Sequence, residues 1–389
     1  MARTPDSVVF VSLTRNKCGR ALVLTALSLL AIGVVMVHSA MASVAAPGEW
    51  YTRLDVRHTL FAAAAAVVLM TVWLVDYRRL AGRGRWPVAA GALLGLSLLC
   101  GVLVFVPGIG HSVNGCHRWI RLGPRQFALG FQPSEIIKIS LVVFLAAWLS
   151  RPGVNVRSFG KTFLPAAGVI AACVGLVITQ DFGTSAVIGL AAVVTLILAG
   201  VPVLHVLTLL PPAALGAYVF IMQSPHRLAR ITAMRDIWST TNPSAYQPRQ
   251  SMLAILTGGW TGKGLGNGTL KLGFLPEDST DFIFSGLCEE CGFVGAMLLL
   301  GLIVLWIRHS WQIALDAGDR FGQVLAGSLG FLIGAQALMH VAVDTVALPP
   351  TGMSLPFVSA GGTSLILMAA AAALVVSVSA RQKVKDPLA

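Results

Sequence analysis

Residues 275–307 read LPEDSTDFIFSGLCEECGFVGAMLLLGLIVLWI, with three acids at the entrance of a long apolar run. The run from 281 to 307 is longer than the roughly 20 apolar residues that a helix needs to cross a bilayer. We therefore predict a transmembrane helix over 281–307, with Glu277, Asp278 and Asp281 at the point where it enters the membrane.

The composition of the whole chain indicates the same class of protein. Of its 389 residues, 56% are hydrophobic and 11% are charged, whereas about 25% are charged in soluble domains. The formal charge of +12 would suggest nucleic acid for a soluble protein, but basic residues of a membrane protein set its topology and contact anionic headgroups. We therefore predict an all-α, polytopic membrane protein.

Similar apolar runs recur along the sequence and predict about ten transmembrane helices. They cover 21–43, 59–79, 87–108, 134–150, 162–180, 184–201, 204–222, 281–307, 323–347 and 357–379. Arg and Lys are concentrated in both tails and in every second loop, which predicts cytoplasmic termini. The expected organisation is a tail at 1–20, a membrane domain at 21–380 and a second tail at 381–389.

Two loops on the predicted outer side depart from this charge rule. Loop 109–133 contains Arg118, Arg121 and Arg125, and the large loop 223–280 between helices 7 and 8 contains Arg227, Arg230, Arg235, Arg249, Lys263 and Lys271. Scatter in a statistical rule is one explanation. Because two separate loops share the excess, we favour an outer surface that binds an anionic ligand.

A glycine-rich stretch, AILTGGWTGKGLGNG at 254–268, lies within the larger loop. It resembles a phosphate-binding loop, but it lacks the Walker spacing and no strand precedes it. A flexible turn explains it equally well. Its candidate phosphate contact is Lys263.

The acids of the opening stretch have two interpretations. Ser279 or Thr280 is placed to cap the helix, and Asp281 in the first turn would suit the helix dipole. An ionised acid at the membrane surface is costly unless it is paired or used. Asp281 is therefore also a candidate general base beside cationic loops.

Glu289 and Glu290 lie deeper in the same predicted helix. Acids within a membrane span usually have a function, but pairing with a basic residue of another helix is the alternative. We favour pairing, with Lys138 as the expected partner. Cys288 and Cys291 have redox or metal spacing, but no second pair accompanies them, so we predict two core residues and no closed metal site.

Two further stretches contain unusual residues. Trp119 beside Arg118 is either an interfacial anchor or part of a groove that faces lipid. Residues 348–364 read LPPTGMSLPFVSAGGTS, and such an irregular backbone at membrane depth must line a cavity or pack within protein. Its small residues, including Ser359, allow helices to approach closely.

These segments together resemble the SEDS family, which includes FtsW, RodA and SpoVE. The motifs are NGCHRWIRLGP, QPSEIIKISLVVFLA, TQDFGTSAVI, FLPEDSTDFIFSGLCEECGFVG and LPPTGMSLPFVSAGGTSL, and the resemblance covers most of residues 20–380. The stretch LPFVS is more similar to FtsW or SpoVE than to RodA, which favours FtsW. Ser279, Cys291, Thr351 and Ala360 depart from the usual family residues.

The resemblance implies a peptidoglycan glycosyltransferase that polymerises lipid II into β-1,4 glycan at the outer face of the cytoplasmic membrane, for septal synthesis. It places the essential aspartate of the family on Asp281 and further conserved positions of the family on Trp119, Glu135 and Lys138. A class B penicillin-binding protein transpeptidase, and other division proteins, are the implied partners. A divalent ion, Mg or Mn, would fit a pyrophosphate substrate.

Polymerisation needs a base for the acceptor hydroxyl and cations for the departing pyrophosphate. Asp281 is the candidate base. The candidate substrate-binding residues are Arg118, Trp119, Glu135, Lys138, Arg230, Arg249, Lys263, Glu277 and Ser359. A lipid II flippase, a RodA-like elongation polymerase and a scaffold without catalysis are the alternatives.

Overall fold

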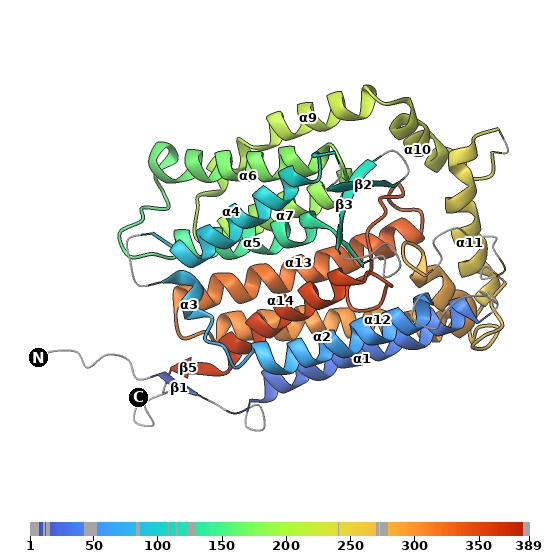
Figure 1. Ribbon diagram of the computed structural model, residues 1–389, viewed down its shortest axis with the longest axis horizontal. Helices are drawn as coiled ribbons and strands as arrows, with labels where there is room; N and C mark the ends of the chain where they lie inside the picture. Colours follow the sequence, from blue (N-terminus) through green and yellow to red (C-terminus); the bar gives the residue numbers. More distant parts are fainter. Residues whose placement is uncertain are drawn as a thin grey trace, which may run out of the picture.

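The helices of a computed structural model form one elongated bundle (Figure 1). The structure describes residues 8–10, 12, 16–42, 53–82, 86–107, 109–113, 116–122, 129–239, 241–269, 272 and 279–383. The long helices are α1 (Lys17–Met41), α2 (Leu54–Val72), α4 (Val88–Leu103), α5 (Pro133–Leu149), α6 (Leu164–Ile178), α7 (Phe182–Leu198), α9 (Leu210–Met222), α12 (Ile283–Leu315), α13 (Arg320–Asp344) and α14 (Thr363–Ser379). Each of the ten predicted apolar runs overlaps one of these helices.

Six helical segments in the described part of the chain are long and apolar enough to cross a membrane. They are Lys17–Met41, Leu54–Val72, Phe159–Ile178, Val203–Met222, Ile283–Leu315 and Arg320–Asp344. The last is the most enclosed, because α13 packs against α5, α7, α12 and α14. Ser328, Gln336, His340 and Asp344 of this central helix are therefore buried inside the bundle and do not face lipid.

Short elements connect the long helices. They are α3 (Arg78–Ala81), the π-helical turn η2 (Phe159–Phe163), α8 (Val203–Leu207), α10 (Pro225–Arg235), the turn η3 (Pro243–Ala245) and α11 (Tyr246–Gly258). The stretch between α9 and α12, expected as a loop, thus contains two helices, α10 and α11. Proline at the first turn of α10 suits a helix start, because proline lacks the amide that would have no partner there.

Two small sheets correct the all-α expectation. Strand β1 (Val8–Phe10) pairs antiparallel with β5 (Arg381–Lys383), which joins the two chain ends. Strands β2 (Gly110–Val113), β3 (Cys116–Leu122) and β4 (Leu129–Phe131) form an antiparallel sheet in the order β2-β3-β4. In Figure 1 the β1–β5 pair lies at one end of the bundle, and β2, β3, α10 and α11 lie toward the other.

Candidate active site

Asp281 lies at the end of the bundle that carries the three-stranded sheet. It precedes the first residue of α12, Ile283, and its side chain is half-buried. The prediction that Ser279 or Thr280 caps the helix is wrong. The N-cap residue is Phe282, and its side chain makes no capping hydrogen bond. Instead the Ser285 amide donates to Asp344 Oδ2 of α13 at 3.0 Å. A carboxylate from a neighbouring helix therefore satisfies a backbone donor of the first turn.

The loop between α13 and α14 fixes the backbone in front of α12. The Ser359 hydroxyl donates to the Thr280 carbonyl at 2.7 Å, and the Ala360 amide donates to the Ser279 carbonyl at 3.0 Å. Ser359 is 1% exposed. This predicted substrate contact therefore holds the chain immediately before Asp281.

The Asp281 carboxylate and the Arg118 guanidinium both lie close to Gly352 of the same loop. A Cβ built on Gly352 would lie 3.5 Å from Asp281 Oδ2 and 3.6 Å from Arg118 Nη1. Gly352 has φ +72°, a conformation that costs other residues strain. Both charged groups therefore lie within van der Waals reach of one point on this loop.

Arg118 reaches this point from β3. Its Nε donates to the Gln180 carbonyl at 2.7 Å, and its Nη1 lies 3.8 Å from Asp181 Oδ2. Asp181 is the N-cap of α7 and accepts from the Thr184 amide. Burial raises the pKa of the Asp181 carboxyl, while Arg118 opposes that rise. Arg118 is 29% exposed, so part of the guanidinium stays open to solvent and to a ligand.

Glu135 and Lys138 form a buried network behind the loop. Lys138 Nζ donates to Glu135 Oε1 at 2.8 Å and to Gln336 Oε1 at 2.6 Å. Glu135 Oε2 accepts from the Ser364 hydroxyl at 2.6 Å, and Gln336 Nε2 donates to the Ser354 carbonyl. The network therefore joins α5, α13, α14 and the 345–362 loop.

The expected pairing of Lys138 with Glu289 or Glu290 is wrong. Lys138 lies one turn after Glu135 on α5, and this spacing places the two side chains in contact. Glu289 pairs instead with Lys263, whose Nζ lies 2.6 Å from Glu289 Oε1. A salt bridge was expected, but the partner comes from the glycine-rich stretch.

That stretch fits into a break in α12. Gly292 has φ +66° and ψ −163° inside the helix. The Phe293 and Val294 amides donate to the Gly259 and Trp260 carbonyls, and the carbonyls of Glu289 and Glu290 accept from the Lys263 and Gly264 amides. The interrupted helix hydrogen bonds are thus replaced by bonds to 259–264, which fix this part of the stretch against α12.

Glycines make this close approach feasible. A Cβ on Gly262 would lie 2.1 Å from the Glu290 carbonyl oxygen, and one on Gly292 would lie 2.3 Å from the Gly262 amide. The Glu289 carboxylate also accepts from the Thr269 amide and hydroxyl. Lys263, a candidate phosphate contact, is therefore part of a structural clamp.

The remaining predicted residues lie farther out or outside the described chain. Arg230 of α10 donates to the Pro350 carbonyl at 3.2 Å, and Arg249 of α11 lies 5.8 Å from the centre of the Tyr246 ring. Trp119 lies on β3 and packs its ring over Gly130 of β4. Glu277 lies outside the described residues.

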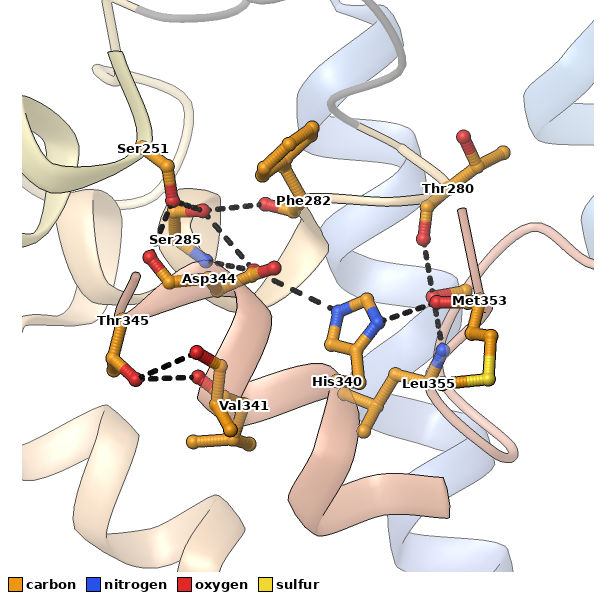
Figure 2. Close-up of polar contacts among 12 residues, drawn as sticks. Ser251, Thr280, Phe282, Ser285, His340, Val341, Asp344, Thr345, Met353 and Leu355 are labelled. Carbon is orange, nitrogen blue, oxygen red and sulfur yellow. Dashed lines mark hydrogen bonds and ion pairs between the residues drawn. The ribbon is translucent and has the colours of Figure 1, made fainter. Parts of the chain in front are cut away.

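Figure 2 shows a polar network that the sequence analysis missed. His340 and Asp344 of α13 meet Ser285 of α12 and Ser251 of α11. Two ionisable residues four positions apart on an otherwise apolar helix are a signal of function within a membrane span. This signal is local, because His340 and Asp344 lie four positions apart in the sequence.

The geometry suits acid–base chemistry on an anionic substrate. A half-buried carboxylate and a partly exposed guanidinium converge on one point, with buried networks behind them. Among the residues that the structure describes, no group of three or more His, Cys, Asp or Glu side chains is placed to hold a metal ion.

Comparisons with known proteins identify relatives of this chain. The sequence model of the family described as "Cell cycle protein", of FtsW, RodA and SpoVE, matches residues 20–384. The chain is 35% identical over 363 residues to a "Probable peptidoglycan glycosyltransferase FtsW" of Geobacter sp. (strain M18), covering 92% of this chain and 95% of the relative. It is 34% identical to "Stage V sporulation protein E" of Bacillus subtilis (strain 168), covering 92% and 96%.

Solved structures agree with the sequence relatives. A chain from work described as "Structural coordination of polymerization and crosslinking by a peptidoglycan synthase complex" superposes with TM-score 0.74 at 27% identity, covering 92% of this chain and 96% of that one. Rod shape determining protein RodA of Thermus thermophilus superposes with TM-score 0.65 at 26% identity, covering 94% and 97%. The resemblance found in the motifs is confirmed, and the chain belongs to the FtsW, RodA and SpoVE family of multi-pass membrane proteins.

Proposed function

We propose that this protein is a peptidoglycan glycosyltransferase that polymerises lipid II at the outer face of the cytoplasmic membrane. In this proposal ten helices cross the membrane and both tails are cytoplasmic. The pairing of β1 with β5 supports this topology, because it holds both chain ends at one end of the bundle. The relatives named peptidoglycan glycosyltransferase support the activity.

The observation that carries the proposal is the convergence of Asp281 and Arg118 around Gly352. In the reaction, the acceptor sugar's 4-hydroxyl attacks the anomeric carbon of the donor, and the bond from that carbon to the pyrophosphate breaks. Asp281 takes the hydroxyl proton as general base. Arg118 stabilises the negative charge that develops on the departing lipid pyrophosphate.

Several other predicted residues take supporting roles in this proposal. Arg230 and Arg249 extend the cationic surface over α10 and α11, and Trp119 lies beside Arg118 on β3. The buried residues Ser359, Glu135 and Lys138 fix the loop that carries Gly352. Glu277 directly precedes this region in the sequence.

The partner and the metal requirement are proposed on chemical grounds. A class B penicillin-binding protein transpeptidase would crosslink the new glycan, and the relative from a peptidoglycan synthase complex supports such a pairing. The FtsW names among the relatives favour septal synthesis with division proteins. A divalent cation would enter with the pyrophosphate, since two phosphates can supply oxygen ligands.

A lipid II transporter is the alternative from another class. It would place ionisable groups along a path across the membrane. Here Lys138 is paired with Glu135 in a buried contact within α5, and Glu289 with Lys263 in a partly buried contact that joins α12 to the glycine-rich stretch. Such pairing supports a structural role for these groups and favours the enzyme.

The test is polymerisation of purified lipid II, with a cognate transpeptidase and Mg²⁺ or Mn²⁺. We expect glycan from the wild type and from Asp236→Asn, a control on the same outer segment whose residue is exposed. We expect none from Asp281→Asn with an unchanged melting temperature. If Asp281→Asn made as much glycan as the wild type, Asp281 would not be the general base. Movement of lipid II across vesicle membranes without glycan formation would favour the transporter.

A further inference from the structure

A pair of buried ionisable side chains lies beneath the candidate active site. His340 and Asp344 occupy the last turns of α13 and are 1% and 0% exposed. His340 Nε2 lies 3.6 Å from Asp344 Oδ2. The titratable groups near the pair are Asp281 on the His340 side and Cys288 of α12 on the Asp344 side.

The hydrogen bond on the other side of the imidazole determines its tautomer. His340 Nδ1 lies 2.7 Å from the Met353 carbonyl oxygen. A carbonyl oxygen can only accept, so Nδ1 carries a proton. In a neutral ring Nε2 would then bear no proton and would direct a lone pair at Asp344.

The carboxylate on the other side also has only lone pairs unless it is protonated. Asp344 Oδ2 accepts from the Ser285 amide at 3.0 Å, and the Ser285 hydroxyl lies at 3.1 Å from the same oxygen. Within the described part of the chain, His340 Nε2 and Asp344 Oδ1 are buried without a hydrogen-bond partner. An ionised Asp344 carboxylate and an unprotonated His340 Nε2 would repel each other, because both present lone pairs. One additional proton, bound either to Nε2 or to the carboxyl group, would therefore stabilise the pair.

The pair also lies where four structural segments meet, as Figure 2 shows. Asp344 binds the first turn of α12 through Ser285, and its backbone carbonyl accepts from Ser251 of α11 at 2.6 Å. His340 binds Met353, the neighbour of Gly352, on the 345–362 loop. Both sides of the Asp281 site are thus attached to two adjacent turns of α13.

We propose that His340 and Asp344 hold one shared proton beneath Asp281 and act as positioning residues for it, keeping its chain segment and the Gly352 loop in register. This proposal rests on the proposed function, in which Asp281 is the base. The pair is buried and therefore acts through Asp281 and not on the substrate itself. Its effect is on the rate of the chemical step through the position and charge environment of Asp281.

Steady-state kinetics of lipid II polymerisation separates positioning from folding. We expect Asp344→Asn and His340→Gln each to lower kcat about tenfold or more per folded enzyme, with KM within about twofold. The kcat of the double variant should recover to within about threefold of wild type. Its two amide side chains can form a hydrogen bond to the Met353 carbonyl and one to each other without a charge. Wild-type kcat per folded enzyme in both single variants would overturn the proposal, as would a double variant that loses the product of the two single effects.

A second measurement needs no activity. In protein labelled with ¹⁵N-histidine and placed in lipid nanodiscs, His340→Gln identifies the His340 resonances among the eight histidines. We expect a protonated Nδ1, and an Nε2 resonance that Asp344→Asn and Asp281→Asn both shift while Asp55→Asn, on α2, does not. An unprotonated Nδ1, or an Nε2 resonance that does not shift in Asp344→Asn, would overturn the proposal of a shared proton. If the wild type makes no glycan, the proposed function fails while this experiment still decides the proton pair.

Discussion

Asp281 and Glu289 lie eight residues apart on the same stretch of chain, yet their surroundings are opposite. Asp281 is half-buried beside a loop glycine and a partly exposed arginine. The Glu289 side chain is 1% exposed and accepts from Lys263 and from the amide and hydroxyl of Thr269. One acid lies half-buried beside the cation of the site, whereas Oε1 of the other is held by Lys263 and Thr269. Residue type alone does not separate the two roles; the burial and the surroundings of each side chain do.

The largest predicted effect concerns the structural acid. Glu289→Ala removes the carboxylate that holds Lys263, which is 29% exposed, and the Thr269 amide and hydroxyl beside the break in α12. Losing hydrogen bonds to a charged group costs about 1.5–3 kcal/mol each. We expect a marked fall in melting temperature in detergent. Replacing both Glu289 and Lys263 by Met should recover part of that loss. An unchanged melting temperature for Glu289→Ala would show that the clamp does not hold the fold.

The next effect concerns the cation of the site. Arg118→Lys keeps the charge but loses the Nε that donates to Gln180 and the planar group whose Nη1 lies near Gly352. The kcat/KM for polymerisation should therefore fall about 10- to 100-fold. Arg235→Lys, on the exposed side of α10, is the control and should keep wild-type kinetics. Wild-type kinetics for Arg118→Lys would mean that the site needs only a positive charge there.

A glycine pair tests the space between the two charged groups. Gly352→Ala and Gly153→Ala both place a methyl group at positive φ, +72° and +88°, so each carries strain of about 1–2 kcal/mol. Only the methyl of Gly352→Ala would approach Asp281 and Arg118; that of Gly153→Ala meets nothing within 4 Å. We expect polymerisation to fall about tenfold for Gly352→Ala alone, measured per folded enzyme. Equal activities would show that the space around Gly352 is not used by the substrate.

The smallest effect lies again on the structural side. The Ser39 hydroxyl of α1 lies 2.7 and 2.6 Å from the two Glu290 oxygens and accepts from the Gly266 amide. Ser39→Ala should lower stability by about 1–3 kcal/mol, because a buried carboxylate loses a donor. The kcat of the folded fraction should not change. A lower kcat without a lower melting temperature would move Glu290 from the structural group to the catalytic one.

The sequence predicted the helices well because apolar length is a local signal. Every predicted run overlaps a helix, and the aspartate and arginine chosen from motifs and charge lie together in the structure. The contacts between residues of different segments were harder to predict from the sequence. Lys138 and Glu289 were expected to pair, but each found a partner that only the packing of α5 and the break at Gly292 reveal.

Two other features required the folded chain. The β2-β3-β4 sheet comes from short strands whose pairing depends on turns, which gives a weak local pattern. The capping of α12 by Asp344 joins residues 59 positions apart, which no spacing rule of a single helix describes. The functional proposal therefore combines local motifs with contacts that only the fold shows.

The most direct test of this account measures glycan polymerisation and melting temperature together for Asp281→Asn and Glu289→Gln. We predict that Asp281→Asn melts like the wild type and makes no glycan. Glu289→Gln should melt at a lower temperature, while its folded fraction polymerises at the wild-type rate. Glycan from Asp281→Asn, or loss of activity in Glu289→Gln at an unchanged melting temperature, would contradict the division of roles between the two acids.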